Sequence, residues 1–143
     1  MKTINILAAL LFTNTLFAKH VEILTCHLTE PFITYKFNPV KKTLTQSYYG
    51  GDGPTTQTLS ENAFFQSMQE EDKDGELQSK YRVVDQKTGK VFINLTLDNN
   101  GSDGMSEYDY PYSAKIGPHH GGCESSSAPA RRIYQSVYGL KNK

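Results

Sequence analysis

The segment "FITYKFNPVKKTLTQSYY", residues 32–49, decides the fold class. Its two ends, residues 32–37 and 43–49, are rich in aromatic and β-branched side chains, which favour strands. The intervening "NPVKK" contains Asn38 and Pro39, and both residue types favour turns. Two short strands joined by a short turn form a hairpin, so the segment predicts a β-hairpin, followed by a loop at "GGDGP".

Short apolar runs separated by turn signals recur along the chain. We expect further strands at residues 20–27, 76–85, 90–98 and 110–116, and we expect "GGCE" (121–124) to begin or end the last strand. A chain of about seven short strands is typical of an all-β domain. The predicted fold is therefore a small antiparallel β-barrel or sandwich.

The segment "LSENAFFQSMQEEDKDG", residues 59–75, has two interpretations. Ser60 can cap a short helix that carries Phe64, Phe65 and Met68 on one side. The same residues can form a strand, followed by the acidic loop "QEEDKDGE". The two interpretations remain open at this point.

Both ends of the chain differ in composition from the middle. Residues 1–18 have the layout of a secretory signal peptide, with Lys2, an apolar run and Ala18 at the cleavage site. The apolar run is shorter than the roughly 20 residues that a bilayer requires. We therefore expect a β domain at 19–123 in a periplasmic or secreted protein, without a membrane span.

Residues 124–143 form a linker and a C-terminal tail. The segment "ESSSAPA" (124–130) has the composition of a linker. The apolar spacing at 133–138 predicts a short helix ended by Gly139, packed back on the domain or frayed. The alternative is a basic tail that binds a partner.

Cys26 and Cys123 lie in the predicted exported part, so we expect them to form one disulfide that closes the domain. A lipid anchor at Cys26 is not expected, because Thr25 stands where a small residue is required. Loss of Lys2 with the signal peptide leaves 14 basic and 15 acidic side chains. This balance gives no electrostatic reason to expect nucleic acid or an anionic membrane as a partner.

Two groups of residues contain side chains that can bind metal ions. Asp98, Asn100 and Ser102 have the spacing of an EF-hand loop, but Asp103 stands where that loop requires glycine. The adjacent histidines His119 and His120 would need an irregular loop to share a metal with His27, because neighbouring residues of a strand point to opposite faces. We expect no metal or other cofactor, with a metal-dependent binding protein as an alternative.

Catalytic groups are weakly indicated. Ser106 in "GMSEY" lacks the Gly-x-Ser-x-Gly elbow, and no spacing favours a triad of Ser106, His119 and Asp103. Carboxylate pairs of the glycosidase kind would be Glu30 with Glu107, or Asp103 with Asp109. We expect a protein without catalytic activity, with a small periplasmic hydrolase that uses Ser106 or its neighbouring carboxylates as the alternative.

Tyrosines cluster near the glycine loops. Tyr110 and Tyr112 share one face of the predicted strand 110–116, and core packing is expected there. Tyr48, Tyr49 and Tyr108 lie close to glycine loops, where they can form an exposed patch for a ligand or a protein partner.

Three motifs lie at the two ends of the domain: "CHLTEPF" (26–32), "DGMSEYDYP" (103–111) and "GGC" (121–123). As a set they resemble the motifs of a bacterial envelope family of unknown function. The chain departs from that family at Ile33, where an aromatic residue is common, and in its tail. The motif residues, together with Tyr108 between them, are the candidate binding residues: Thr29, Glu30, Pro31, Phe32, Asp103, Gly104, Met105, Ser106, Tyr108, Tyr110 and Pro111.

The resemblance implies a small secreted or lipid-anchored β domain. Members sometimes accompany META domains or modules similar to lysozyme inhibitors. We therefore expect an exported monomeric binding module, of which one version is lysozyme-inhibitor-like, with an envelope protein or a cell-wall hydrolase as its partner.

The same motifs also have a structural interpretation. We expect the Glu30 carboxylate to accept hydrogen bonds from the backbone amides of the 103–106 turn. Asp103 and Ser106 would cap that turn, and Met105 would plug the end of the barrel.

Overall fold

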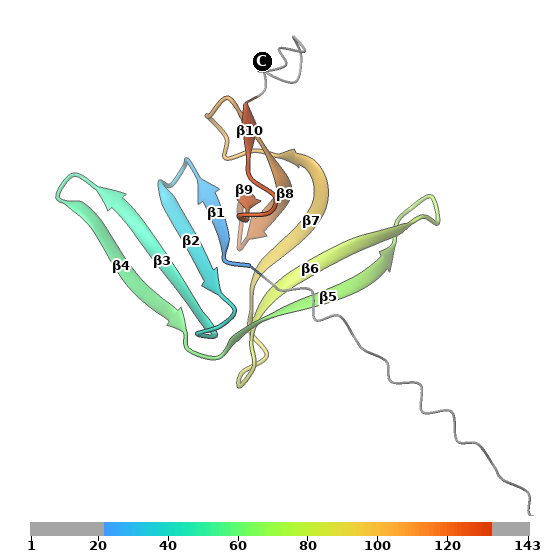
Figure 1. Ribbon diagram of the computed structural model, residues 1–143, viewed down its shortest axis with the longest axis horizontal. Helices are drawn as coiled ribbons and strands as arrows, with labels where there is room; N and C mark the ends of the chain where they lie inside the picture. The colour runs from blue at the N-terminus through green and yellow to red at the C-terminus, as the bar shows by residue number, and fades with distance from the viewer. Residues whose placement is uncertain (1–21, 133–143) are drawn as a thin grey trace, which may run out of the picture.

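The computed structural model describes residues 22–132, which contain ten strands and no helix (Figure 1). The strands are β1 (Leu24–Leu28), β2 (Ile33–Asn38), β3 (Thr43–Gly50), β4 (Gly53–Ser60), β5 (Ala63–Glu71), β6 (Leu77–Asp85), β7 (Val91–Gly101), β8 (Tyr108–Ile116), β9 (His119–Glu124) and β10 (Arg131–Arg132). The all-β prediction is confirmed for this part of the chain. The predicted signal peptide at 1–18 and the predicted helix at 133–138 lie outside the described residues.

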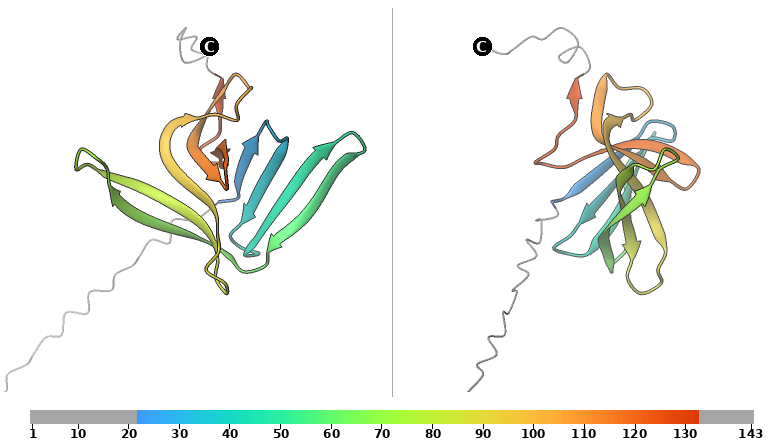
Figure 2. Two further views of the ribbon diagram at one scale, coloured as in Figure 1. Left: turned by 180° about the vertical axis from the view of Figure 1, so that it is seen from behind. Right: turned by 90° about the vertical axis from the view of Figure 1, so that its right-hand side faces the viewer.

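All strand pairs are antiparallel, and the main sheet has the order β4-β3-β2-β1-β9-β8-β7-β6-β5, with β10 added to β8. It consists of two meanders, β1–β4 and β5–β9, that meet side by side through β1 and β9. Figures 1 and 2 show that the outer hairpins of the two meanders, β3–β4 and β5–β6, splay apart. Residues 22–132 contain no helix that is long and apolar enough to cross a membrane.

The predicted barrel or sandwich of about seven strands is wrong, because the sheet has more strands and does not close. The edge strands β4 and β5 follow one another in the chain and stay close only near Ser60 and Ala63. Beyond that corner both strands carry mostly exposed polar side chains on both faces. Closing the barrel would therefore bury little apolar surface, and burial of apolar surface is the main driving force for closure.

Two of the additional strands lie in segments that were left open or predicted as a loop. Residues 63–71 form β5, so the strand interpretation of that segment is confirmed over the helix. Residues 53–60 form β4, although "GGDGP" was predicted as a loop; only Gly51 and Asp52 turn the chain there. Pro54 lacks a backbone N–H, and the edge of a sheet accommodates such a residue.

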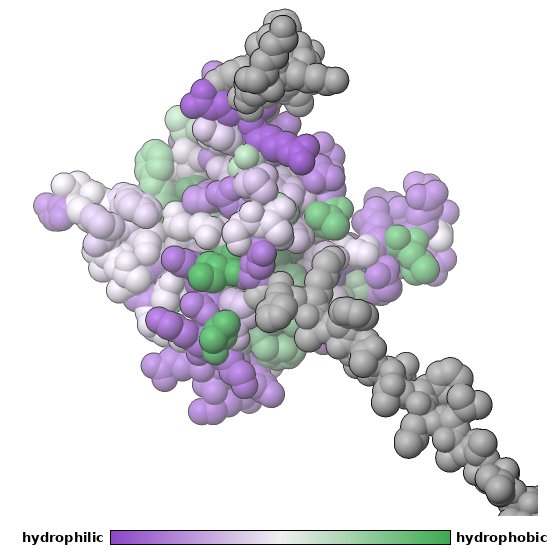
Figure 3. Space-filling view, in the orientation of Figure 1, coloured by the Kyte–Doolittle hydropathy of each residue, from purple (hydrophilic) through white to green (hydrophobic). Residues whose placement is uncertain are grey.

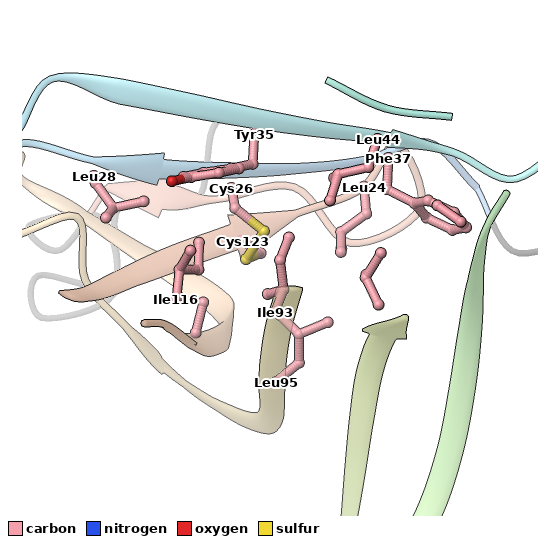
Figure 4. Close-up of a cluster of buried hydrophobic side chains, with 13 residues drawn as sticks. Leu24, Cys26, Leu28, Tyr35, Phe37, Leu44, Ile93, Leu95, Ile116 and Cys123 are labelled. Atoms are coloured by element: carbon pink, nitrogen blue, oxygen red, sulfur yellow. A yellow bond between two sulfur atoms is a disulfide. The ribbon is translucent and has the colours of Figure 1, made fainter. Parts of the chain in front are cut away.

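The core lies between the meanders, on the inner face of the curved sheet (Figure 4). The side chains that are almost fully buried are Phe37, Leu44, Ile93, Leu95, Val83, Cys26 and Cys123. They alternate with exposed or half-buried residues along β1, β2 and β7, as the period of two in a strand requires.

A disulfide joins Cys26 and Cys123, as predicted, across a sequence separation of 97 residues. The two cysteines are direct partners in the β1–β9 ladder, which pairs only residues 25–27 with 122–124. The disulfide therefore lies at the seam between the two meanders.

The two glycines of "GGCE" allow a close approach at this seam. A Cβ at Gly122 would lie 2.3 Å from the Tyr110 ring, and a Cβ at Gly121 would lie 2.6 Å from the His27 carbonyl oxygen. Without side chains, both residues let β1 and the Tyr110 ring pack directly on the backbone of β9.

The segment after Cys123 returns to the domain. The Glu124 carboxylate accepts a hydrogen bond from the Ala130 N–H, and the Glu22 carboxylate accepts hydrogen bonds from Ser126 and Ser127. Residues 131–132 then pair with β8. These contacts fold the predicted linker back along the domain.

Candidate functional site

The "CHLTEPF" and "DGMSEYDYP" motifs lie against each other where the β1–β2 turn meets the 102–107 loop. The backbone N–H of Thr29 donates to the carbonyl oxygen of Asp103 at 2.9 Å, and the Thr29 hydroxyl donates to the same oxygen. Both segments are fixed by strands that flank the disulfide seam, so the fold holds the two motifs together.

Asp103 organises the 102–107 loop. Its Oδ1 accepts hydrogen bonds from the backbone N–H groups of Met105 (3.1 Å) and Ser106 (2.7 Å), and its Oδ2 accepts one from the Tyr110 hydroxyl (3.1 Å). Partial burial alone would raise the pKa of Asp103, but hydrogen bonds from Ser106, Met105 and Tyr110 outweigh that effect and lower it. Asp103 is thus a charged turn cap, as expected.

The expected role of Glu30 is wrong. The Glu30 side chain is exposed, and the amides of the 103–106 turn bond to Asp103 instead. A carboxylate within the turn reaches these amides over two or three residues, whereas Glu30 would have to reach them across the loop. Met105 is 68% exposed, so it plugs no core either.

Tyr110 is buried but lies outside the main core cluster, contrary to the expectation of a shared core face with Tyr112. Its ring lies against Gly122, with its centroid 5.6 Å from that of His27. The ladder between β7 and β8 is irregular between Leu97 and Gly101, which changes the course of β8 relative to β7 before Tyr112. Burial raises the pKa of Tyr110 to about 12, and the nearby Asp103 charge adds to the rise.

Ser106 is not presented as a nucleophile. Its Oγ is buried and makes no hydrogen bond of good geometry, although it lies close enough to Asp103 to lower the pKa of that carboxylate. A buried hydroxyl is not accessible to a substrate that arrives from solvent.

The histidines are separated. His27 Nε2 lies 3.2 Å from Glu124 Oε1, whereas His119 and His120 are exposed at the start of β9. Ser106 and Asp103 line one hollow together with His27, and His119, the third member of the triad that the sequence did not favour, is absent from that lining. Among residues 22–132 no group of three His, Cys, Asp or Glu side chains could hold a metal ion.

A hollow of about 370 Å³ opens beside the joined motifs, and we call it the motif pocket. It is lined by His27, Leu28, Thr29, Phe32, Ile33, Thr34, Tyr49, Asp103, Met105 and Ser106. Three of the large side chains are exposed: Phe32 at 54%, Tyr49 at 53% and Met105 at 68%. The motif pocket therefore combines exposed apolar side chains with a polar loop that is fixed by hydrogen bonds.

The remaining motif residues lie elsewhere or face solvent. Tyr108 is half-buried, and its hydroxyl accepts a hydrogen bond from Arg132 Nε at 2.9 Å, so it is not part of an exposed patch. Pro111 is buried and lines a separate hollow with Ala128 and Pro129 of the returning segment. Gly104 has φ +100°, a conformation that favours glycine, so its role is to let the loop turn.

The sequence did not predict that Tyr49 and His27 line the same pocket as the two motifs. Tyr49 was predicted only as part of an exposed aromatic patch with Tyr48. The Tyr49 N–H donates to the Phe32 carbonyl oxygen at 3.1 Å, which places the two rings at the same end of the β2–β3 hairpin. The predicted hairpin contained this signal, because residues 32 and 49 are its outermost positions.

On the face seen in Figure 3, hydrophobic residues form small separate patches among hydrophilic ones.

No protein-family model, curated protein or solved structure matches this chain.

Proposed function

We propose that the protein is an exported, non-catalytic binding module that engages a protein partner through the motif pocket. The observation that carries this proposal is the joint exposure of Phe32, Tyr49 and Met105 around one hollow. Aromatic and methionine side chains exposed together on a rigid support are typical of the centre of a protein interface.

The polar groups of the motifs support binding over catalysis. Asp103, Tyr110 and Thr29 are engaged with one another or with the loop backbone, and the Ser106 hydroxyl is shielded. Such groups hold the 102–107 loop in shape and thereby present Met105. Pre-ordered loops bind with a smaller entropic penalty.

Export is part of the proposal. A disulfide at the seam is typical of proteins in oxidising compartments, and it agrees with the expected signal peptide. The family resemblance suggests an envelope protein as the partner, and a cell-wall hydrolase such as lysozyme as one specific case.

The test compares capture by three forms of the purified protein from an envelope extract. The double variant Phe32→Ser, Met105→Ser should lose the partner that wild type captures, with affinity at least tenfold weaker. The control is Val40→Ser, Leu77→Ser, because both side chains are highly exposed, at 90% and 73%, and neither lines the motif pocket.

Equal capture by the pocket variant and by wild type would contradict the proposal, as would equal loss in the control. Inhibition of lysozyme by wild type and not by the pocket variant would support the hydrolase-binding case. Absence of inhibition at large molar excess would remove that case and leave the proposed protein interface to the capture experiment.

A further inference from the structure

A second hollow, of about 440 Å³, lies on the outer face of strands β6 to β9, and we call it the basic hollow. Its charged and polar lining residues are Glu70, Lys80, Arg82, Asn94, Thr96, Ser113, Lys115 and His120. Its lining residues are distinct from those of the motif pocket.

Strand register places four of these residues in one row. Arg82 pairs with Asn94, Asn94 with Lys115, and Lys115 with His120, across four neighbouring strands. Directly paired residues point to the same face of a sheet. The row lies on the face opposite the core, because the alternate residues Val83, Ile93, Leu95 and Ala114 are buried.

The row concentrates positive charge. Neighbouring strands are about 4.8 Å apart, so the backbone positions of Arg82 and Lys115 are about 10 Å apart, with the Asn94 amide between them. Long cationic side chains at this spacing can converge on one anionic group.

Within the described part of the chain, neither of these two cations forms an ion pair, although Glu70 lines the same hollow, where the hydrogen bond and charge of Lys80, and then the charge of Arg82, lower its pKa. Glu70 pairs with Lys80 at 2.5 Å, and the Asp98 carboxylate accepts a hydrogen bond from Ser113 at 2.7 Å. Between residues 22 and 132, neither Arg82 nor Lys115 has a carboxylate within ion-pair distance. An anion between them would gain two charge-assisted hydrogen bonds.

We propose that the basic hollow binds an anionic polysaccharide, with a carboxylate or sulfate group seated between Arg82 and Lys115. The Asn94 amide and the Thr96 hydroxyl supply donors and acceptors for the hydroxyl groups of the neighbouring sugar. An acidic protein segment fits less well, because interfaces with proteins need apolar anchors, and the side chains of Leu95 and Ala114 face the core instead.

The test measures binding of purified protein to polygalacturonate at low ionic strength, with neutral dextran as the uncharged polymer. Wild type should bind polygalacturonate and not dextran, and added salt should weaken the binding, because salt screens exposed charges. The double variant Arg82→Ala, Lys115→Ala should bind polygalacturonate at least tenfold more weakly, since each of the two substitutions removes a charged hydrogen-bond donor.

The matched control is Lys36→Ala, Lys41→Ala, which removes the same total charge from exposed positions outside the basic hollow. Its affinity should stay within about twofold of wild type. Lys115→Glu, a single exposed substitution that reverses the charge, should abolish binding without loss of thermal stability.

Three outcomes would overturn the proposal. The first is no binding of wild type to polygalacturonate, and the second is an equal loss in the control variant. The third is equally tight binding of poly-glutamate or of free galacturonate, which would mean that charge alone, or a single small anion, is recognised. In contrast, a selective loss of polygalacturonate binding in Asn94→Ala, which keeps both cations, would support recognition of the sugar.

Discussion

Gly122 in β9 determines how closely the Tyr110 ring can pack against the seam between the two meanders. Its missing side chain leaves room for the Tyr110 ring, which in turn donates a hydrogen bond to Asp103. The position of the 102–107 loop therefore depends on a glycine in β9.

We predict that Gly122→Ala destabilises the protein by about 1–3 kcal/mol, because the new methyl group overlaps the Tyr110 ring and neither side can retreat easily. Denaturant unfolding measures the change. Gly51→Ala is the control, since a Cβ at Gly51 meets no atom within 4 Å, and its effect should stay within about 0.5 kcal/mol. Equal stability of Gly122→Ala and wild type would show that the ring moves away freely.

At this scale the sequence predicted local interactions better than distant ones. The cap by Asp103 was predicted because an aspartate commonly bonds to backbone amides two or three residues ahead. The role of Glu30 was wrong because it depended on the relative position of two loops. Exposure of Met105 was also missed, since the sequence does not show which side of a loop faces solvent.

Among the elements, the corner between β4 and β5 depends on one carboxylate at the end of β6. Asp85 Oδ2 accepts a hydrogen bond from Ser60 at 2.6 Å, and Oδ1 accepts bonds from the backbone of Lys87 and Thr88. The Ser60 hydroxyl also accepts a bond from the Asn62 N–H. Asp85 therefore links the β6–β7 turn to the corner.

We predict that Asp85 contributes to acid sensitivity. The Ser60 hydroxyl and the Thr88 N–H lower the pKa of Asp85 from 3.8 to about 2. A folded-state pKa below the unfolded value stabilises the fold above about pH 4, and the contribution is lost as pH falls toward about 2. Asp85→Ala should therefore melt below wild type at pH 6, and the difference should shrink at pH 2.

Asp52→Ala serves as the control, because Asp52 lies in the exposed turn before β4. Its melting temperature should follow that of wild type at both pH values. A constant difference between Asp85→Ala and wild type from pH 6 to pH 2 would contradict an ionic contribution from Asp85.

Strand existence was predictable where apolar residues alternate, as in β2, β3 and β6 to β8. The longer of the missed strands, β4, opens with Gly53 and Pro54 and has few apolar residues. Its pairing with β3 follows from the hairpin geometry and not from burial. A pattern based on burial finds such an edge strand poorly.

The whole molecule consists of two meanders held at one short seam. Only three residue pairs join β1 to β9, and the Cys26–Cys123 disulfide is one of them. The sequence predicted this bridge from the cysteine count and the expected export. It did not predict the open sheet, because closure depends on whether two distant edges have apolar surface to share.

We predict that Cys26→Ala, Cys123→Ala lowers the free energy of unfolding by about 4–5 kcal/mol, the chain-entropy value for a closed loop of about 100 residues. Denaturant unfolding of the variant and of wild type, with and without reductant, measures the difference. Reduced wild type should match the variant. A loss below about 1 kcal/mol would show that the ladder alone holds the seam.

The position of that seam also determines how the chain can reach its fold. All neighbours in the main sheet except β1 and β9 are consecutive in the chain, so each meander can assemble from contacts that are close in sequence. Local contacts form quickly, whereas closure of a long loop is slow. The slow step of folding is therefore expected to be the pairing of β1 with β9. A comparison of the refolding rates of the oxidised protein and of the cysteine-free variant would measure how much this long loop closure slows folding.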